Sequence, residues 1–284
     1  MDDKPVVTRF APSPSGYLHL GHAYSALFAS IAAGPGQGRF LLRIEDIDQG
    51  RCKPAFEDAI YEDLAWLGLD WERPVRRQSA HFEEYRQALA RLDDKDLLYP
   101  CFCTRTDIAA EIERAGRAPH DFAGPDGPLY PGTCRHMPHD QRDSRLAQGD
   151  PFALRLNMEK ACKSAGPLTW HEADGCSHLA APEIFGDVVL ARKDSPSSYH
   201  LSVTVDDHLQ GVTLVTRGED LRLATHIHRL LQALLAYNVP DYRFHRMLTD
   251  DDGRRYAKRN RSLTLRSLRN DGQTPADVRR RIGL

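Results

Sequence analysis

The sequence predicts an α/β fold built on a parallel sheet that an inserted segment interrupts. In the first hundred residues, predicted strands alternate with predicted amphipathic helices, and this order produces a parallel sheet. A cysteine-containing stretch with short strands then breaks the alternation. A β-branched strand at 212–216 and an amphipathic helix at 219–237 resume it.

The composition is that of an ordinary folded chain. Its 284 residues allow one large or two modest domains, and a net charge of −2 gives no overall field that attracts nucleic acid. No apolar run approaches the roughly 20 residues needed to span a membrane. The N-terminus is short and acidic, unlike a signal peptide, and the six cysteines then favour a reducing compartment. We therefore expect a cytoplasmic protein without a membrane partner.

Residues 9–22, Arg-Phe-Ala-Pro-Ser-Pro-Ser-Gly-Tyr-Leu-His-Leu-Gly-His, organise the rest of the chain. They leave a strand, turn at Gly16 and begin a helix near His19. The first amides of a helix lack internal partners, and its dipole favours negative charge there. His19 and His22 share one face, and Gly21 permits close approach to the backbone. The stretch therefore predicts an anion site; a proline-rich turn with two surface histidines is the alternative.

The next elements form the first half of the sheet. Residues 23–33 predict a buried helix, and 40–48 predict a strand ending in an acidic turn, with Arg43 and Glu45 on one face. This pair is either a binding feature or an ordinary strand-end charge cluster. Helices are expected at 55–67 and at 79–92, the second capped by Ser79.

A strand at 97–103 ends in Cys101 and Cys103, and Cys134 follows across a loop after a short helix at 107–114. Three thiols in this arrangement suit a tetrahedral zinc site. The candidate fourth ligands are Tyr130, His120 and His136. Three reduced cysteines without metal are the alternative. Three further cysteines fit no ligand spacing and are interpreted as ordinary thiols: Cys52, Cys162 and Cys176.

Short strands at 151–158 and 168–171, separated by a polar turn, are grouped with the cysteine segment. A strand at 185–192 is expected to return toward the parallel sheet. The basic residues after Arg254 form either a surface that contacts a polyanion or a solvated, partly frayed tail. The resulting division is 1–98 for the first half of the domain with the parallel sheet, 99–180 for the inserted subdomain, 181–245 for the second half, and 246–284 for a basic loop and short helical tail.

The His19-Leu-Gly-His22 motif, with the residues before it, resembles the nucleotide-binding signature of the glutamyl class I aminoacyl-tRNA synthetases. The resemblance implies a Rossmann-type domain and ATP with Mg²⁺ as substrate. His19, Gly21 and His22 would hold ATP phosphates while a carboxylate attacks the α-phosphate. Residues 252–260 resemble the second, lysine-rich signature, in which Arg255 and Lys258 would bind ATP. His19, His22 and Lys258 would be catalytic.

The stretches around Glu45 and Arg217-Gly-Glu-Asp also resemble this family. The resemblance implies that Glu45 contacts the substrate amino group, that Tyr199 lines the amino-acid pocket and that Arg217 pairs with a substrate carboxylate. Asp206 and Asp207 would support the site. The full set of implied glutamate-binding residues is Arg9, Ala11, Ser13, Glu45, Tyr199 and Arg217. We expect His226 and His228 at the surface rather than as ligands.

The Cys-x-Cys and Tyr-x-x-x-Cys spacings resemble those of the glutamyl-queuosine tRNA(Asp) synthetases, the short relatives of the glutamyl family. The implied ligands of a structural zinc are Cys101, Cys103, Tyr130 and Cys134. The chain ends at Leu284, and we therefore expect no anticodon-binding domain. The resemblance implies a monomer that transfers ATP-activated glutamate to the queuosine base of tRNA(Asp).

Three alternatives remain open at this stage. A truncated glutamyl-tRNA synthetase would charge the tRNA terminus instead. A paralogue could bind glutamate or tRNA without catalysis, and the altered sequence at 255–258 is the feature that favours it. A nucleotidyltransferase shares the histidine chemistry, but it does not require the Glu45 and Arg217 stretches.

Overall fold

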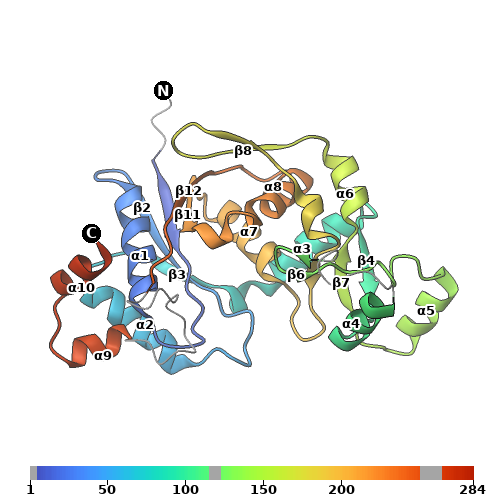
Figure 1. Cartoon of the computed structure of the whole chain (residues 1–284), viewed down its shortest axis with the longest axis horizontal. Helices are drawn as coiled ribbons and strands as arrows, with labels where there is room; N and C mark the ends of the chain where they lie inside the picture. Colours follow the sequence, from blue (N-terminus) through green and yellow to red (C-terminus); the bar gives the residue numbers. More distant parts are fainter. Residues whose placement is uncertain (1–4, 115–122, 250–263) are drawn as a thin grey trace.

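The computed structural model describes residues 5–114, 123–249 and 264–284, which form two lobes joined through a central group of helices (Figure 1). The described chain confirms the predicted α/β class with a parallel sheet. Within the described residues, no helix has both the length and the apolar character that crossing a bilayer requires.

The parallel strands form the first lobe. Three of them pair in the order β1–β2–β3, namely β1 (Val7–Phe10), β2 (Arg39–Ile44) and β3 (Glu72–Arg77). Two others pair in parallel, β11 (Leu214–Gly218) and β12 (Asp241–His245). The amide of Thr213 donates to the carbonyl of Val7 at 3.0 Å, which places β11 beside β1. The direction in which strands are added to the sheet therefore reverses between β1 and β11. In open α/β sheets, ligands bind at such a switch point.

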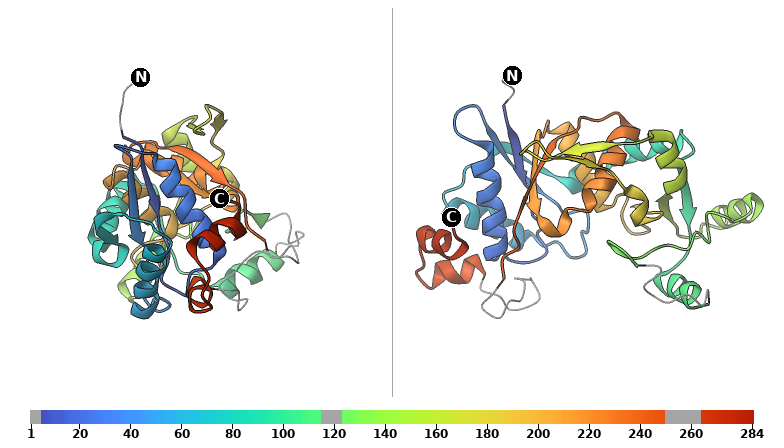
Figure 2. Two further views of the ribbon diagram at one scale, coloured as in Figure 1. Left: turned by 90° about the vertical axis from the view of Figure 1, so that its left-hand side faces the viewer. Right: turned by 45° about the horizontal axis from the view of Figure 1, so that its top comes forward.

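The helices of this lobe include the end of the chain. The helices α1 (Leu20–Ala33), α2 (Pro54–Trp66), α9 (Leu265–Asn270) and α10 (Pro275–Ile282) contribute to one apolar core (Figure 2). Leu265, Leu268, Val278 and Ile282 are all buried in it. The interpretation of these last residues as a frayed tail is therefore wrong, because their apolar side chains share one buried face. The predicted lysine-rich loop, with Arg255 and Lys258, lies outside the described residues.

The central helices are α3 (Phe82–Asp93), α7 (Tyr199–Leu209) and α8 (Ala224–Leu235). Ser79 does not cap the second predicted helix, because a 3₁₀ turn (Gln78–His81) precedes α3 and His81 occupies the N-cap position. Ser79 instead donates from its amide and its hydroxyl to Asp46, at 2.8 and 2.6 Å. This contact ties the start of α3 to the turn after β2.

The second lobe contains an antiparallel sheet in the order β10–β7–β4, made of β4 (Leu98–Cys101), β7 (Ala153–Leu156) and β10 (Val189–Ala191). The strand predicted at 185–192 was expected to return to the parallel sheet, and this is wrong. It pairs with β7 because Leu190 and Ala191 pack into the core shared with the central helices. The other elements of this lobe are α4 (Arg105–Arg114), β5 (Ala123–Gly124), β6 (Gly127–Pro128), α5 (His139–Ala147) and α6 (Met158–Ala165).

Helix α6 replaces the polar turn expected after 158. The hairpin that follows it, β8 (Thr169–His171) and β9 (Ser177–Leu179), does not pack with the cysteine segment as predicted. Trp170 is buried beside Tyr242 of β12, with ring centroids 5.6 Å apart, and joins the core of the parallel sheet. Burial of this indole decides where the hairpin lies. The domain boundaries themselves stay a prediction.

A buried ionic network joins the central helices to the parallel sheet. Asp206 and Asp207 lie on α7 and are almost fully inaccessible. Asp207 accepts from Arg9 Nε at 2.9 Å and from Arg43 NH2 at 2.7 Å, and Asp206 accepts from Arg76 Nε at 2.7 Å. The three arginines come from β1, β2 and β3. One helix therefore neutralises a cation from each of three adjacent strands.

Candidate active site and metal centre

The N-terminus of α1 lies at the carboxyl end of β1, as the sequence predicts. His19 is its N-cap residue, and Nδ1 of His19 accepts the amide of Gly21 at 3.1 Å. In return, Nδ1 of His22 accepts the amide of His19 at 3.2 Å. The two rings lie together, with centroids 3.8 Å apart. The histidines thus form a reciprocal capping box, a role usually taken by hydroxyl and carboxylate side chains.

This arrangement determines where the histidine protons lie. An Nδ1 atom that accepts a hydrogen bond carries no hydrogen, so in both rings the hydrogen is on Nε2. Each ring therefore carries its Nε2–H group at a helix N-terminus, where anions are already favoured. A Cβ at position 21 would lie 3.0 Å from Cε1 of His19, so a larger residue there would push the His19 ring aside. These features suit oxygen atoms of a phosphate.

The main chain fixes the loop between β1 and α1. Glu45 donates its amide to the carbonyl of Pro12 at 3.0 Å, and Lys53 donates to Pro14 at the same distance. The segment after β2 therefore lies against the signature loop. Thr264 forms a bridge with His19, so the start of α9 also contacts this loop.

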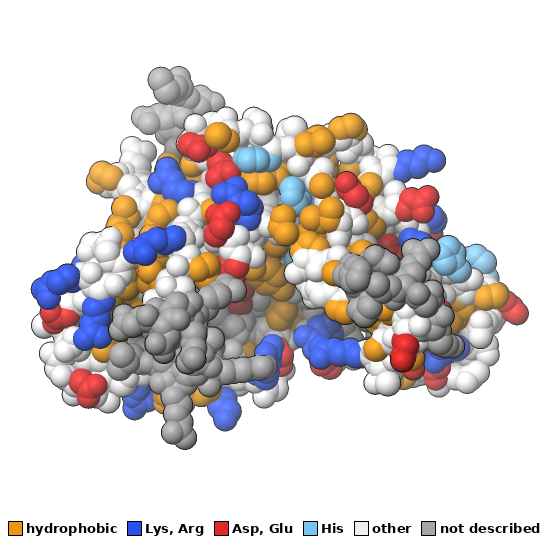
Figure 3. Space-filling model, in the orientation of Figure 1, with side chains coloured by type: hydrophobic (Ala, Val, Ile, Leu, Met, Phe, Trp, Pro, Cys, Tyr) orange, Lys and Arg blue, Asp and Glu red, His pale blue; other side chains and the backbone are white. Residues whose placement is uncertain are grey.

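A groove of about 810 Å³ begins beside the loop and runs toward the inserted segment. Ser13, Glu45 and Tyr199, three of the predicted glutamate-binding residues, line it together. Lysine and arginine side chains lie on both sides of the hollow between the lobes (Figure 3), and five basic residues line the groove itself: Arg51, Arg105, Arg155, Arg192 and Lys193. No sequence motif marks these five residues.

Glu45 is mostly buried, and its carboxylate lies 3.6 Å from Nε of Arg43. Burial is the largest influence on Glu45 and raises its pKa to about 7, although Arg43 and Arg9 act in the opposite direction. Tyr199 also has a raised pKa, chiefly because it is buried. A buried carboxylate is costly to ionise without a positively charged partner, and an ammonium group supplies that positive charge. Glu45 is therefore suited to binding an ammonium group.

Arg9, Ala11 and Arg217 do not line this groove. Arg9 is buried and bonded to Asp207 and to the carbonyl of Thr216, at 2.9 and 3.0 Å, so it already has anionic and carbonyl partners. Ala11 is half-buried on the loop after β1. Arg217 is buried at the end of β11, with its guanidinium 5.2 Å from the ring of Tyr242.

Two histidines on the central helices were interpreted wrongly as surface residues. His228 is only 4% exposed, and its Nδ1 lies 3.0 Å from NH1 of Arg217. His226 is half-buried and accepts the amide of Ala181 at 3.1 Å. The signal for His228 was available, since it shares a helix face with the apolar residues Ala224, Leu231 and Leu235.

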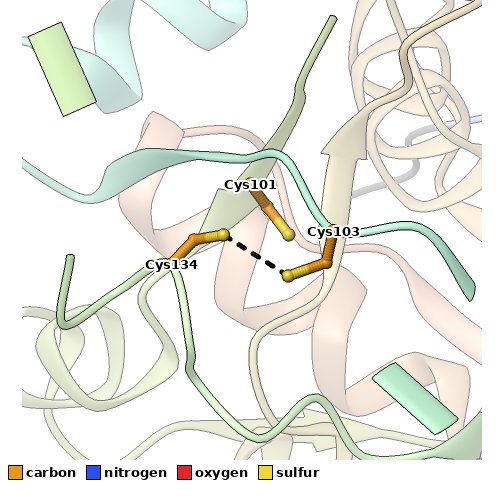
Figure 4. A group of neighbouring side chains, drawn as sticks. All are labelled: Cys101, Cys103 and Cys134. Carbon is orange, nitrogen blue, oxygen red and sulfur yellow. Dashed lines mark hydrogen bonds between the residues drawn. The ribbon is translucent and has the colours of Figure 1, made fainter. Parts of the chain in front are cut away.

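The three predicted cysteine ligands come together in the second lobe. The sulfurs of Cys101, Cys103 and Cys134 point toward one another (Figure 4) and all lie within 4.8 Å of each other. The Cys103 and Cys134 sulfurs are 3.5 Å apart, and the Tyr130 hydroxyl is 3.5 Å from the Cys103 sulfur. Four zinc ligands at tetrahedral positions have sulfurs about 3.8 Å apart. The three thiols therefore fit a zinc ion.

Two features adapt this cluster to a cation. The hydrogen bond between the thiols of Cys101 and Cys134 lowers the pKa of Cys134 to about 6, and a metal ligand must be a thiolate. Tyr130 accepts the amide of Cys134 at 2.8 Å, which orients its hydroxyl beside the sulfurs. His136 is exposed and lies against Arg135, so its side chain is not part of the cluster. His120 lies outside the described residues.

Comparison with known proteins decides the family. A family model described as the catalytic domain of class I tRNA synthetases (E and Q) matches residues 5–284. The chain belongs to this family. It is therefore a ligase-type enzyme of the aminoacyl-tRNA synthetase class, as the signature motifs predicted.

Individual relatives of this synthetase are of two kinds. The chain is 49% identical over 286 residues to a glutamyl-Q tRNA(Asp) synthetase of Rhodobacter capsulatus, which covers 98% of this chain and 100% of the relative. It is 36% identical to a glutamate–tRNA ligase of Aquifex aeolicus, over 95% of this chain but 55% of the relative. A crystal structure of the glutamate–tRNA synthetase of Elizabethkingia anophelis superposes with a TM-score of 0.74 at 26% identity, covering 95% of this chain and 54% of that one.

The capping role and the phosphate role of the first histidine can be separated. In His19→Asn, the side-chain oxygen can still accept the Gly21 amide, but the Nε2–H donor is lost. We expect a melting temperature close to that of the wild type and a fall of roughly 10²–10³-fold in glutamate-dependent pyrophosphate exchange. Exchange within a few-fold of the wild type would contradict the phosphate role.

The raised pKa of Glu45 predicts a pH dependence of glutamate binding. Only the ionised form of Glu45 attracts the ammonium group, so the apparent KM for glutamate should fall by about tenfold between pH 6 and pH 8 and flatten above that range. Initial rates at saturating ATP measure this change. Glu45→Gln should raise KM and remove the pH dependence; the same slope in this variant would assign the titration to another group.

The fourth zinc ligand can be identified by metal retention. We expect purified protein to contain one zinc per chain and Cys134→Ser to contain almost none. Tyr130→Phe should release zinc faster to a colorimetric chelator, whereas His136→Ala should match the wild type, because His136 lies away from the sulfurs. The opposite ranking of the last two variants would exclude the tyrosine.

Proposed function

We propose that the enzyme activates glutamate with ATP and transfers it to the queuosine base at the wobble position of tRNA(Asp). The observation that carries this proposal is the 49% identity to the Rhodobacter capsulatus glutamyl-Q tRNA(Asp) synthetase, over 98% of this chain and 100% of that protein. The glutamate–tRNA ligase of Aquifex aeolicus is matched over only 55% of its length.

The geometry of the first step supports carboxylate adenylation. A glutamate carboxylate oxygen attacks the α-phosphorus of ATP, the bond to the bridging oxygen breaks, and pyrophosphate leaves with Mg²⁺. Charge on the phosphate oxygens would be met by Nε2–H of His19 and of His22 at the N-terminus of α1. Such donors are aligned before reaction and lower the barrier electrostatically. Arg255 and Lys258 are proposed, from the sequence alone, to add positive charge.

The glutamate-binding residues divide according to the groups of the substrate. Glu45 would bind the ammonium group, and Tyr199 would form the wall of the groove beside it. Arg217 would bind the side-chain carboxylate, since a planar guanidinium can bond both of its oxygens. Its Nε is buried and has no hydrogen-bond partner among the described residues, which leaves donor capacity for an anion. Arg9 would act mainly through Asp207.

In the second step, a hydroxyl of the modified base attacks the carbonyl carbon of glutamyl-adenylate, its proton passes to water, and AMP leaves with the bonding electrons. The basic residues along the groove between the lobes suit the phosphates of an RNA loop. Cys101, Cys103, Cys134 and Tyr130 would hold a structural zinc that stabilises the inserted segment beside this groove.

The position of labelled glutamate tests the acceptor. Radiolabelled glutamate should appear on tRNA(Asp) that contains queuosine, and nuclease digestion should place it in the anticodon stem-loop. The same tRNA with guanosine at that position is the control and should remain unlabelled. Label on the terminal adenosine would instead support a glutamyl-tRNA synthetase that charges the tRNA end. Absence of both labelling and pyrophosphate exchange would support a non-catalytic paralogue.

A further inference from the structure

We propose that Asp126, His200 and His228 form a positioning chain that holds the guanidinium of Arg217 in the orientation needed to bind the substrate carboxylate. This inference rests on the proposed function, because it concerns the same glutamate site. It gives the inserted segment, which contributes Asp126, an indirect part in recognising the amino acid.

The chain of contacts is continuous over four side chains. NH1 of Arg217 lies 3.0 Å from Nδ1 of His228, and Nε2 of His228 lies 3.2 Å from Nδ1 of His200. Nε2 of His200 lies 2.8 Å from a carboxylate oxygen of Asp126. The contacts join the end of β11, helices α8 and α7, and the turn between β5 and β6. The β5–β6 hairpin reaches the central helices from the second lobe (Figure 1).

The donor and the acceptor of each hydrogen bond in the positioning chain can be assigned. A guanidinium can only donate, so Nδ1 of His228 must accept and its Nε2 must carry the hydrogen. That hydrogen is donated to Nδ1 of His200, whose own hydrogen is then on Nε2 and faces Asp126, an acceptor. Every donor meets an acceptor with both histidines neutral. Burial, followed by the charge of Arg217, lowers the pKa of His228 well below its usual value, in agreement with this state.

The positioning chain restrains Arg217, whose other contacts leave it able to bind an anion. NH2 of Arg217 donates to the hydroxyl of Thr225, and the guanidinium lies 5.2 and 5.8 Å from the rings of Tyr242 and Phe244. Nε is buried without a hydrogen-bond partner in the described part of the chain. Because bidentate binding requires the guanidinium plane to match that of the carboxylate, fixing NH1 and NH2 prepares the site.

Asp126, at the outer end of the positioning chain, is exposed to solvent, whereas His228, at its inner end, is buried. The side chain of Asp126 is 60% exposed, that of His200 is 11% exposed, and His228 is buried. Removing Asp126 therefore leaves no buried charge without a partner, yet it frees His200 to rotate. An effect of this exposed carboxylate on glutamate binding is expected for a positioning role and not for a packing role.

Kinetics of the full-length enzyme separate these roles. In glutamate-dependent pyrophosphate exchange, Asp126→Ala and His200→Ala should each raise the KM for glutamate about tenfold, equivalent to about 1.4 kcal/mol. Both kcat and the KM for ATP should stay within about twofold of the wild type, because neither residue contacts the phosphate site. The matched control is His208→Ala, a histidine near the end of the same helix whose Nδ1 bonds Asn238 and not this chain.

Conservative variants test the hydrogen-bond logic. Asp126→Asn keeps an oxygen acceptor for His200 and should restore a KM near that of the wild type. His228→Asn keeps an acceptor near NH1 of Arg217 and should bind glutamate better than His228→Ala. Unchanged KM in Asp126→Ala and His200→Ala would overturn the proposal, and so would equal increases in the KM values for glutamate and ATP. Melting temperatures identify any variant that is poorly folded, and Asp126→Ala is expected to match the wild type.

Arg217→Ala distinguishes failure of this inference from failure of the proposed function. If that variant loses glutamate-dependent exchange while Asp126→Ala and His200→Ala behave as wild type, the glutamate site stands and the positioning chain is overturned. If Arg217→Ala exchanges normally, the assignment of Arg217 to glutamate fails and the positioning chain fails with it.

Discussion

The architecture depends on the burial of two carboxylates, Asp206 and Asp207, at adjacent positions of one helix. They face Arg9, Arg43 and Arg76, which come from three neighbouring parallel strands. Buried charges of this kind are costly to leave without partners, and removing one member of such a group typically costs about 3–5 kcal/mol. Burial alone would raise the pKa of Asp207, but Arg9 and Arg43 outweigh it and hold the pKa below its usual value.

The same helix connects this network to the proposed substrate site. Tyr199 and His200 begin α7, two turns before the carboxylates, so the ionic network that anchors the helix also sets the positions of both rings. Glu45 comes directly after β2 and two residues beyond Arg43, and its raised pKa arises within the same buried environment. Anchoring and recognition are therefore adjacent along the chain and in space. A rigid support of this kind is what a binding site requires to hold charged groups in fixed geometry.

Local chemistry made several features predictable from sequence. The prolines, Gly16 and Gly21 locate the turn and the helix start at His19, and the cysteine spacing indicates the thiol cluster. Other features depend on contacts between distant segments. A strand pattern does not specify its direction or its partner, so β10 was assigned to the wrong sheet. The burial of His228, by contrast, follows from its place on the apolar face of α8, which the residue spacing already indicates.

The central claim, that the carboxylates of α7 hold the arginines of the sheet, is tested most directly by a double-mutant cycle between Arg43 and Asp207. Chemical denaturation of Arg43→Met, Asp207→Asn and the double variant gives the free energies of unfolding. We predict that each single change costs roughly 3–5 kcal/mol and that the double variant costs at least about 2 kcal/mol less than the sum. Single changes that each cost below about 1 kcal/mol, or effects additive within about 0.5 kcal/mol, would contradict the account.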